Sequence, residues 1–127
     1  FSDNQFHNAG LTYYGRKYED LGRYNITKNT EDVGKFRTPS LREIMKTRPY
    51  MHNGLFPEIR GVLNLYNMGM PNLKPKGEQV NDKLFPKTSP LLQKLDLNKG
   101  ELDALEAFLG SITSVIYREP APENLPQ

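Results

Sequence analysis

Histidines, methionines and tyrosines are the residues of this 127-residue chain whose chemistry could support a reactive site. His7 and His52 are the only histidines, and each suits an acid–base group near neutral pH, a metal ligand or a hydrogen-bonding structural residue. Met51, Met68 and Met70 carry thioethers, which bind soft metal centres but more commonly fill gaps in a core. On residue type alone, packing and hydrogen-bonding roles are the more common ones for these side chains.

The composition excludes several classes of protein and site. There is no cysteine, which excludes disulfides and cysteine-ligated zinc or iron–sulfur sites within the chain. Lys and Arg total 17 against 15 Asp and Glu, which is too balanced for a dedicated nucleic-acid or membrane-surface binder. No apolar run approaches the ~20 residues that span a bilayer, and no signal peptide is recognised. The mean hydropathy of −0.69 suggests that something other than a large apolar core helps to hold this single domain together.

Two short helices are predicted in the middle of the chain. Residues 38–45 combine Thr38 as N-cap with a proline at the first helical position and apolar residues at i, i+3, i+4 spacing. Residues 57–67 begin at a proline and carry a clean apolar stripe that includes Tyr66. Gly69 is a natural residue to end this helix. The stripe predicts that Tyr66 points inward.

The rest of the chain contains one further helix and long irregular segments. Residues 98–113 give the best helix, which Asn98 caps. Residues 1–38 are rich in aromatic rings without periodicity, and residues 71–97 form a Pro- and Lys-rich excursion. Residues 118–127 are predicted as a loose Pro-rich tail. The predicted fold class is therefore all-α, with short helices, long loops and no strand, a design that suits wrapping a large rigid ligand.

Several segments, in order, resemble a known family. Phe36–Arg42 and Pro49–Gly54 resemble the C-terminal haem domain of the bacterial di-haem cytochrome c peroxidases, a family that includes the MauG-type enzymes. Asp3–Leu11 is similar to the stretch that follows the haem-attachment motif there. Leu65–Gly69 resembles the end of the helix that carries the axial ligand, and Leu102–Thr113 resembles the closing helix.

The resemblance implies a cytochrome c-like domain over residues 1–117 and a periplasmic oxidoreductase as the complete protein. It implies reduction of hydrogen peroxide with electrons from a small donor protein, or a MauG-like oxidation of a protein substrate. The segment would supply the distal side of the C-terminal haem and is not expected to be active alone. The implied partners are an N-terminal haem domain or complementary chain, with a homodimer left open and no nucleic acid.

One departure from the family is large. The family attaches haem c through Cys-x-x-Cys-His, and this chain has no cysteine. The chain is therefore expected to begin just after the attachment site, with the covalent tether outside it. The expectation also requires a hollow lined by the helix that starts at Pro57.

Tyr66 is the principal candidate site residue. It lies fourteen residues after His52, the spacing at which the family places the distal axial ligand of the C-terminal-domain haem. That ligand is Met in many peroxidases and Tyr in MauG-type enzymes, and a phenolate favours ferric iron. Met70, Met68 and Met51 are rival ligands, with Met70 ranked above Met68. A core tyrosine with a satisfied hydroxyl is the structural alternative.

The remaining candidates surround the implied cofactor. The resemblance places His52 near the haem, on a propionate, and assigns the backbone carbonyls of Thr47 and Pro49 to a calcium ion. Arg37 and Arg42 could pair with propionates, because a guanidinium fork fits a carboxylate, but solvated arginines are the common case.

Two further readings remain open. The lysines between positions 74 and 94 could dock an acidic electron donor or form a solvated loop. The alternative function is a haem-free helical binding or scaffold module, which explains the lack of cysteine without a truncation.

Overall fold

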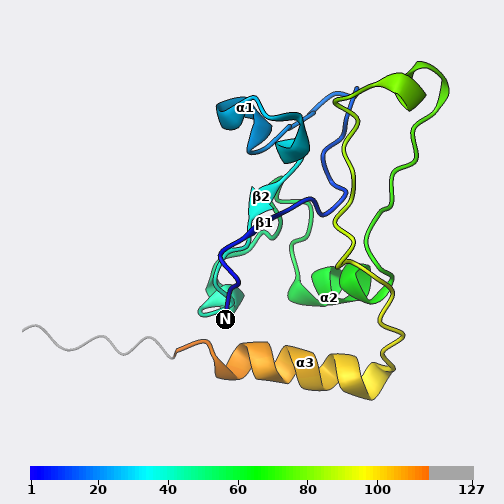
Figure 1. Cartoon of the computed structure of the whole chain (residues 1–127). Coiled ribbons are helices and arrows are strands. Elements are labelled where there is room, and N and C mark those ends of the chain that lie inside the picture. Colours follow the sequence, from blue (N-terminus) through cyan, green and yellow to red (C-terminus); the bar gives the residue numbers. More distant parts are fainter. Residues whose placement is uncertain (115–127) are drawn as a thin grey trace, which may run out of the picture.

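A computed structural model describes residues 1–114, and its elements are distributed along an otherwise irregular chain. Figure 1 shows α3 along one edge of the molecule with α2 beside it, while α1 lies near the opposite end. The predicted tail 118–127 and the predicted domain limit at residue 117 lie outside the described residues. The elements in chain order are β1 (Phe6–His7), α1 (Tyr24–Thr27), η1 (Thr30–Asp32), β2 (Phe36–Arg37), η2 (Ile44–Lys46), α2 (Ile59–Asn67), η3 (Gly77–Asn81) and α3 (Lys99–Ser111).

The prediction of an all-α fold was wrong. Only 32% of the structure is helical, and β1 and β2 form a two-stranded antiparallel sheet in which Phe6 faces Arg37 and His7 faces Phe36. Each strand has two residues, which is too short to produce the apolar–polar alternation that marks a strand in sequence. The architecture is a mixed one in which short helices and a small sheet are joined by long loops.

The helix predicted over residues 38–45 does not form. The Leu41 N–H donates to the Phe1 carbonyl at 3.1 Å, so this donor serves a contact with the N-terminal segment. Glu43 has a φ of 63°, a left-handed conformation that interrupts an α-helix. The segment is therefore a bend followed by the single 3₁₀ turn η2.

The helix predicted over residues 57–67 is confirmed as α2, although it starts after Glu58 rather than at the proline. Gly69 ends it with a φ of 89°, as predicted. The Gly69 N–H donates to the Tyr66 carbonyl at 3.0 Å. The Met70 N–H donates to the Leu65 carbonyl at 3.1 Å, which completes a Schellman-type end. The helix end is thus fixed directly after Tyr66.

The long helix α3 is also confirmed, and Asn98 and Glu101 form the predicted capping box. It packs against α2, where Arg60 lies 2.5 Å from Asp103 and 2.6 Å from Glu106. Among residues 1–114, no helix has the length and apolar character that crossing a membrane requires. The buried hydrophobic cluster between the elements consists of Tyr50, Ile59, Val62 and Leu109.

Candidate functional site

Tyr66 lies on the same face of α2 as two core residues but is less covered than they are. Ile59 is 3% exposed and Val62 is 8% exposed, whereas Tyr66 is 37% exposed. The spacing 59, 62, 66 keeps all three side chains on one stripe of the helix. The core therefore covers Ile59 and Val62 and leaves the Tyr66 ring partly exposed.

The Tyr66 hydroxyl forms no hydrogen bond with any residue that the structure describes. Burial raises the pKa of Tyr66 above its ordinary value, and no neighbouring charge contributes to that shift. A phenol that is partly desolvated and without a partner favours its neutral form until a cation approaches it. As phenolate, the same oxygen is a hard anionic ligand that suits ferric iron.

The three rival methionines occupy different environments. Met70 is 7% exposed and Met68 is 67% exposed, on either side of Gly69. Met51 is half-buried against the hydrophobic core cluster. Met70 and Met51 thus have surroundings typical of packing residues, and Met68 faces outward.

His52 stacks on Phe36, with ring centroids 3.7 Å apart and planes at 11°. Desolvation lowers the pKa of His52, although the negative charge of Asp20 opposes the shift. His7 pairs with Phe36 across the β1–β2 sheet, and its Nε2 lies 2.7 Å from the Asp3 carboxylate. Phe36 therefore links both histidines, a role that sequence reasoning missed.

The two candidate arginines have local partners. Arg37 donates to the Asn4 side chain at 2.6 Å. The Arg42 guanidinium lies 5.0 Å from the centre of the Phe1 ring. Within residues 1–114, no hydrogen bond or ion pair joins either arginine to Tyr66 or His52. The structure therefore does not bring the predicted propionate ligands to Tyr66 as a connected set.

The candidate calcium ligands lie at an exposed turn. The Thr47 hydroxyl donates to the Ile44 carbonyl at 3.0 Å, and the carbonyls of Thr47 and Pro49 accept no hydrogen bond from the described part of the chain. No group of three or more His, Asp or Glu side chains in that part could hold a metal ion. Two carbonyls alone are an incomplete site for calcium, which takes six to eight oxygen ligands.

Two hollows open on the surface, and neither is lined by α2. The lysine hollow, of about 410 Å³, has Lys35, Lys83 and Lys87 in its wall. The tyrosine hollow, of about 550 Å³, has Tyr13 and Tyr14 in its wall. Neither of these two hollows is the expected one along the helix after Pro57.

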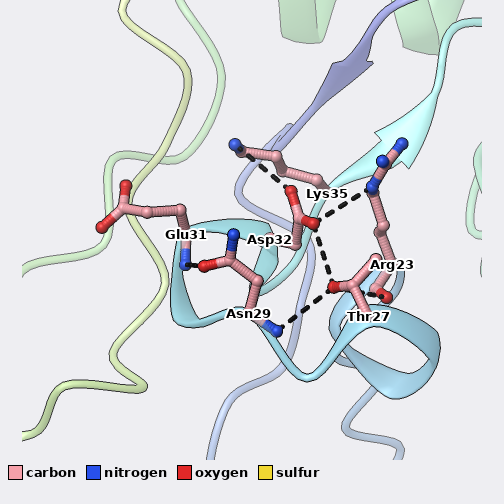
Figure 2. Close-up of polar contacts among 6 residues, drawn as sticks. All are labelled: Arg23, Thr27, Asn29, Glu31, Asp32 and Lys35. Atoms are coloured by element: carbon pink, nitrogen blue, oxygen red, sulfur yellow. Dashed lines mark hydrogen bonds and ion pairs between the residues drawn. The ribbon is translucent and has the colours of Figure 1, made fainter.

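A polar cluster around Asp32 was also missed by sequence reasoning (Figure 2). The Asp32 carboxylate accepts from Arg23 Nε at 3.1 Å and from Thr27 Oγ1 at 2.9 Å, and it lies 3.6 Å from Lys35 Nζ. Burial alone would raise the pKa of Asp32, but these hydrogen bonds and charges outweigh it and lower the pKa. Arg23, Thr27 and Lys35 all contact this one carboxylate, so the cluster fastens α1 to η1.

Comparisons with known proteins identify relatives with redox functions. The chain is 42% identical over 94 residues to cytochrome-c peroxidase IdrP1 of Pseudomonas sp. (strain SCT), covering 74% of this chain and 22% of the relative. It is 36% identical over 114 residues to cytochrome-c peroxidase IdrP2 of Denitromonas iodatirespirans, covering 90% and 27%. It is 30% identical over 150 aligned residues to methylamine utilization protein MauG of Paracoccus denitrificans, covering 98% and 37%.

A solved structure agrees with these relatives. The crystal structure of a MauG-like protein associated with microbial copper homeostasis matches with a TM-score of 0.69 and 34% identity, over 86% of this chain and 32% of that one. No family model matches the chain. The chain spans between 22% and 37% of the length of the three relatives described above.

Proposed function

Because the chain belongs to the family of the di-haem cytochrome c peroxidases and MauG, we propose that it is the part of their C-terminal haem domain that supplies the distal side of the haem. The observation that carries this assignment is the position of Tyr66 at the end of the α2 stripe, where it is 37% exposed while the core covers Ile59 and Val62. The phenolic oxygen of Tyr66 forms no hydrogen bond with any residue among 1–114, and its ring lies on the same face of α2 as the buried Ile59 and Val62.

The residues at this face fit a haem. The Tyr66 oxygen would hold the haem iron as a phenolate, a hard anionic ligand that suits the ferric state. Desolvation keeps His52 neutral over more of the physiological pH range, so its ring N–H can donate to a propionate while stacked on Phe36. Arg37 and Arg42 would reach propionates only by exchanging their present contacts with Asn4 and Phe1. The thioether-forming cysteines would come from outside this chain.

The proposed activity is that of an oxidoreductase. Haem, when bound, would supply the redox centre that reduces hydrogen peroxide with electrons from a small donor protein in the periplasm. A tyrosine rather than a methionine at position 66 favours the MauG-like variant, in which a protein is oxidised. The carbonyls of Thr47 and Pro49 would contribute two ligands to a calcium ion completed by the N-terminal haem domain.

The test is the optical spectrum of the full-length protein before and after addition of peroxide. We expect a Soret band with two haems per protein and a change in that band when peroxide is added. A full-length protein that carries no thioether-forming cysteine pair and shows no Soret band would contradict the proposal. That outcome would favour the haem-free scaffold.

A further inference from the structure

The tyrosine hollow is formed by two segments far apart in sequence, and the proposed function does not use it. Its volume is about 550 Å³, and residues 10–16 form one side while residues 71–85 form the other. Gly10 allows the two sides to meet, because a Cβ at this position would lie 2.1 Å from the Pro71 carbonyl oxygen. The φ of Gly10 is 76°, which a glycine adopts without strain. The walls are therefore fixed by backbone contact.

The lining of the tyrosine hollow contains three aromatic rings. Tyr14 and Phe85 pack edge to face, with centroids 5.7 Å apart and planes at 77°. The Tyr14 hydroxyl donates to the Asp82 carboxylate across the two segments, and burial together with this bond raises the pKa of Tyr14 to about 12. The Tyr14 ring is thus held in one orientation, and Tyr13 adds a third ring to the wall. These surfaces suit a flat apolar body.

The rim of the tyrosine hollow is cationic. Arg16, Lys74 and Lys76 line it, and no carboxylate is among its lining residues. Within residues 1–114, none of these three cations forms an ion pair, whereas Lys35 in the lysine hollow lies 3.6 Å from Asp32. Three unpaired cations around an aromatic wall have the charge and shape to hold an anionic group whose body enters the hollow.

We propose that the tyrosine hollow is a binding site for a small aromatic carboxylate. The ring stacks among Tyr13, Tyr14 and Phe85, and the carboxylate faces Arg16 and the two lysines at positions 74 and 76. The site is separate from the Tyr66 stripe, because the tyrosine hollow includes no residue of α2.

Calorimetric titration of the full-length protein with naphthalene-2-carboxylate tests the site. We expect saturable binding with a single site per chain. Cyclohexanecarboxylate and naphthalene-2-carboxamide should each bind at least about tenfold more weakly, because the first has no aromatic ring and the second has no charge. Equal binding of either compound would overturn the proposed chemistry, and absence of binding by the naphthoate would overturn the site.

Substitutions of residues that line the tyrosine hollow test whether the naphthoate binds there. Lys74→Gln and Lys76→Gln should each raise the Kd about threefold, and the double variant about tenfold, as expected for partly exposed ion pairs. Tyr13→Leu should weaken the naphthoate while leaving cyclohexanecarboxylate unchanged. Lys87→Gln is the matched control, because this lysine lies in the lysine hollow. An equal loss of affinity in the control would overturn the assignment to the tyrosine hollow.

Discussion

Asn67 and Leu97 are joined by two hydrogen bonds that hold the end of α2 against the segment leading into α3. The Leu97 N–H donates to Asn67 Oδ1 at 2.8 Å, and Asn67 Nδ2 donates to the Leu97 carbonyl at 3.0 Å. The Leu95 N–H also donates to the Asn67 carbonyl at 3.0 Å. The excursion between the two helices is therefore closed at its base, immediately beside Tyr66.

Replacing Asn67 should loosen this closure. Asn67→Ala leaves the N–H and the carbonyl of Leu97 without partners, and we expect the free energy of unfolding to fall by about 2 kcal/mol. Urea unfolding of the full-length protein, followed by circular dichroism, measures the change. Asn64→Ala is the control, because this exposed side chain on the same helix bonds to no described residue, and it should change stability by about 0.5 kcal/mol or less. Equal losses in both variants would contradict the bridge.

The glycine that ends α2 should be intolerant of a side chain. At Gly69 the φ is 89°, and a Cβ would lie 2.8 Å from the Lys94 backbone nitrogen. Gly69→Ala should therefore lower the free energy of unfolding by more than about 1 kcal/mol. Gly110→Ala, in open space within α3, should raise it by up to about 1 kcal/mol. Thermal unfolding compares the two, and opposite signs are the expected result.

The elements that sequence predicted correctly are those with strong local signals. Both α2 and α3 combine helical periodicity with a recognisable end, Gly69 for the first and the Asn98 box for the second. The segment 38–45 shows equally good periodicity but fails, because Leu41 bonds to Phe1 and Glu43 takes a left-handed conformation. Those contacts come from distant parts of the chain, so local pattern could not reveal them.

The candidate site was predictable only in part. Tyr66 was singled out by its place on a helical stripe and by the resemblance. Its role as a haem ligand stays a prediction. The stack of Phe36 on His52 and the pairing of Asp32 with Arg23 were not foreseen. Neither pair has a periodic spacing, and both depend on how irregular loops cross.

Glu43 should make the chain sensitive to acid. Its carboxylate lies 2.7 Å from Lys46 Nζ and accepts from the Ser114 N–H at 2.9 Å, and these contacts lower its pKa to about 2. Since the folded pKa lies below the ordinary 4.5, its contribution to stability is present above pH 4.5 and is lost as pH falls toward 2. Glu43→Gln should therefore flatten the dependence of the melting temperature on pH in that window.

The control for Glu43 removes a different carboxylate. Glu78 lies exposed in η3 and forms no ion pair with the described residues, so Glu78→Gln should leave the slope between pH 2 and 4.5 unchanged. If Glu43→Gln and the unsubstituted protein lose stability in parallel, the contacts of Glu43 with Lys46 and Ser114 do not stabilise the folded protein.

Tyr66 offers the most direct test of the proposed haem face, because Tyr, Phe and Met at this position would offer the iron a phenol oxygen, no ligand and a thioether, respectively. Tyr66→Phe keeps the ring on the stripe and removes the oxygen, so the ferric optical spectrum of the haem-loaded protein should change if that oxygen is a ligand. Tyr66→Met supplies a thioether, which favours ferrous iron and should raise the reduction potential. Tyr50→Phe is the control, because Tyr50 is 8% exposed in the core cluster and should leave both readouts unchanged. A ferric spectrum that is identical in Tyr66→Phe would show that this oxygen does not bind iron, and the ligand would then be sought among Met70, Met68 and Met51.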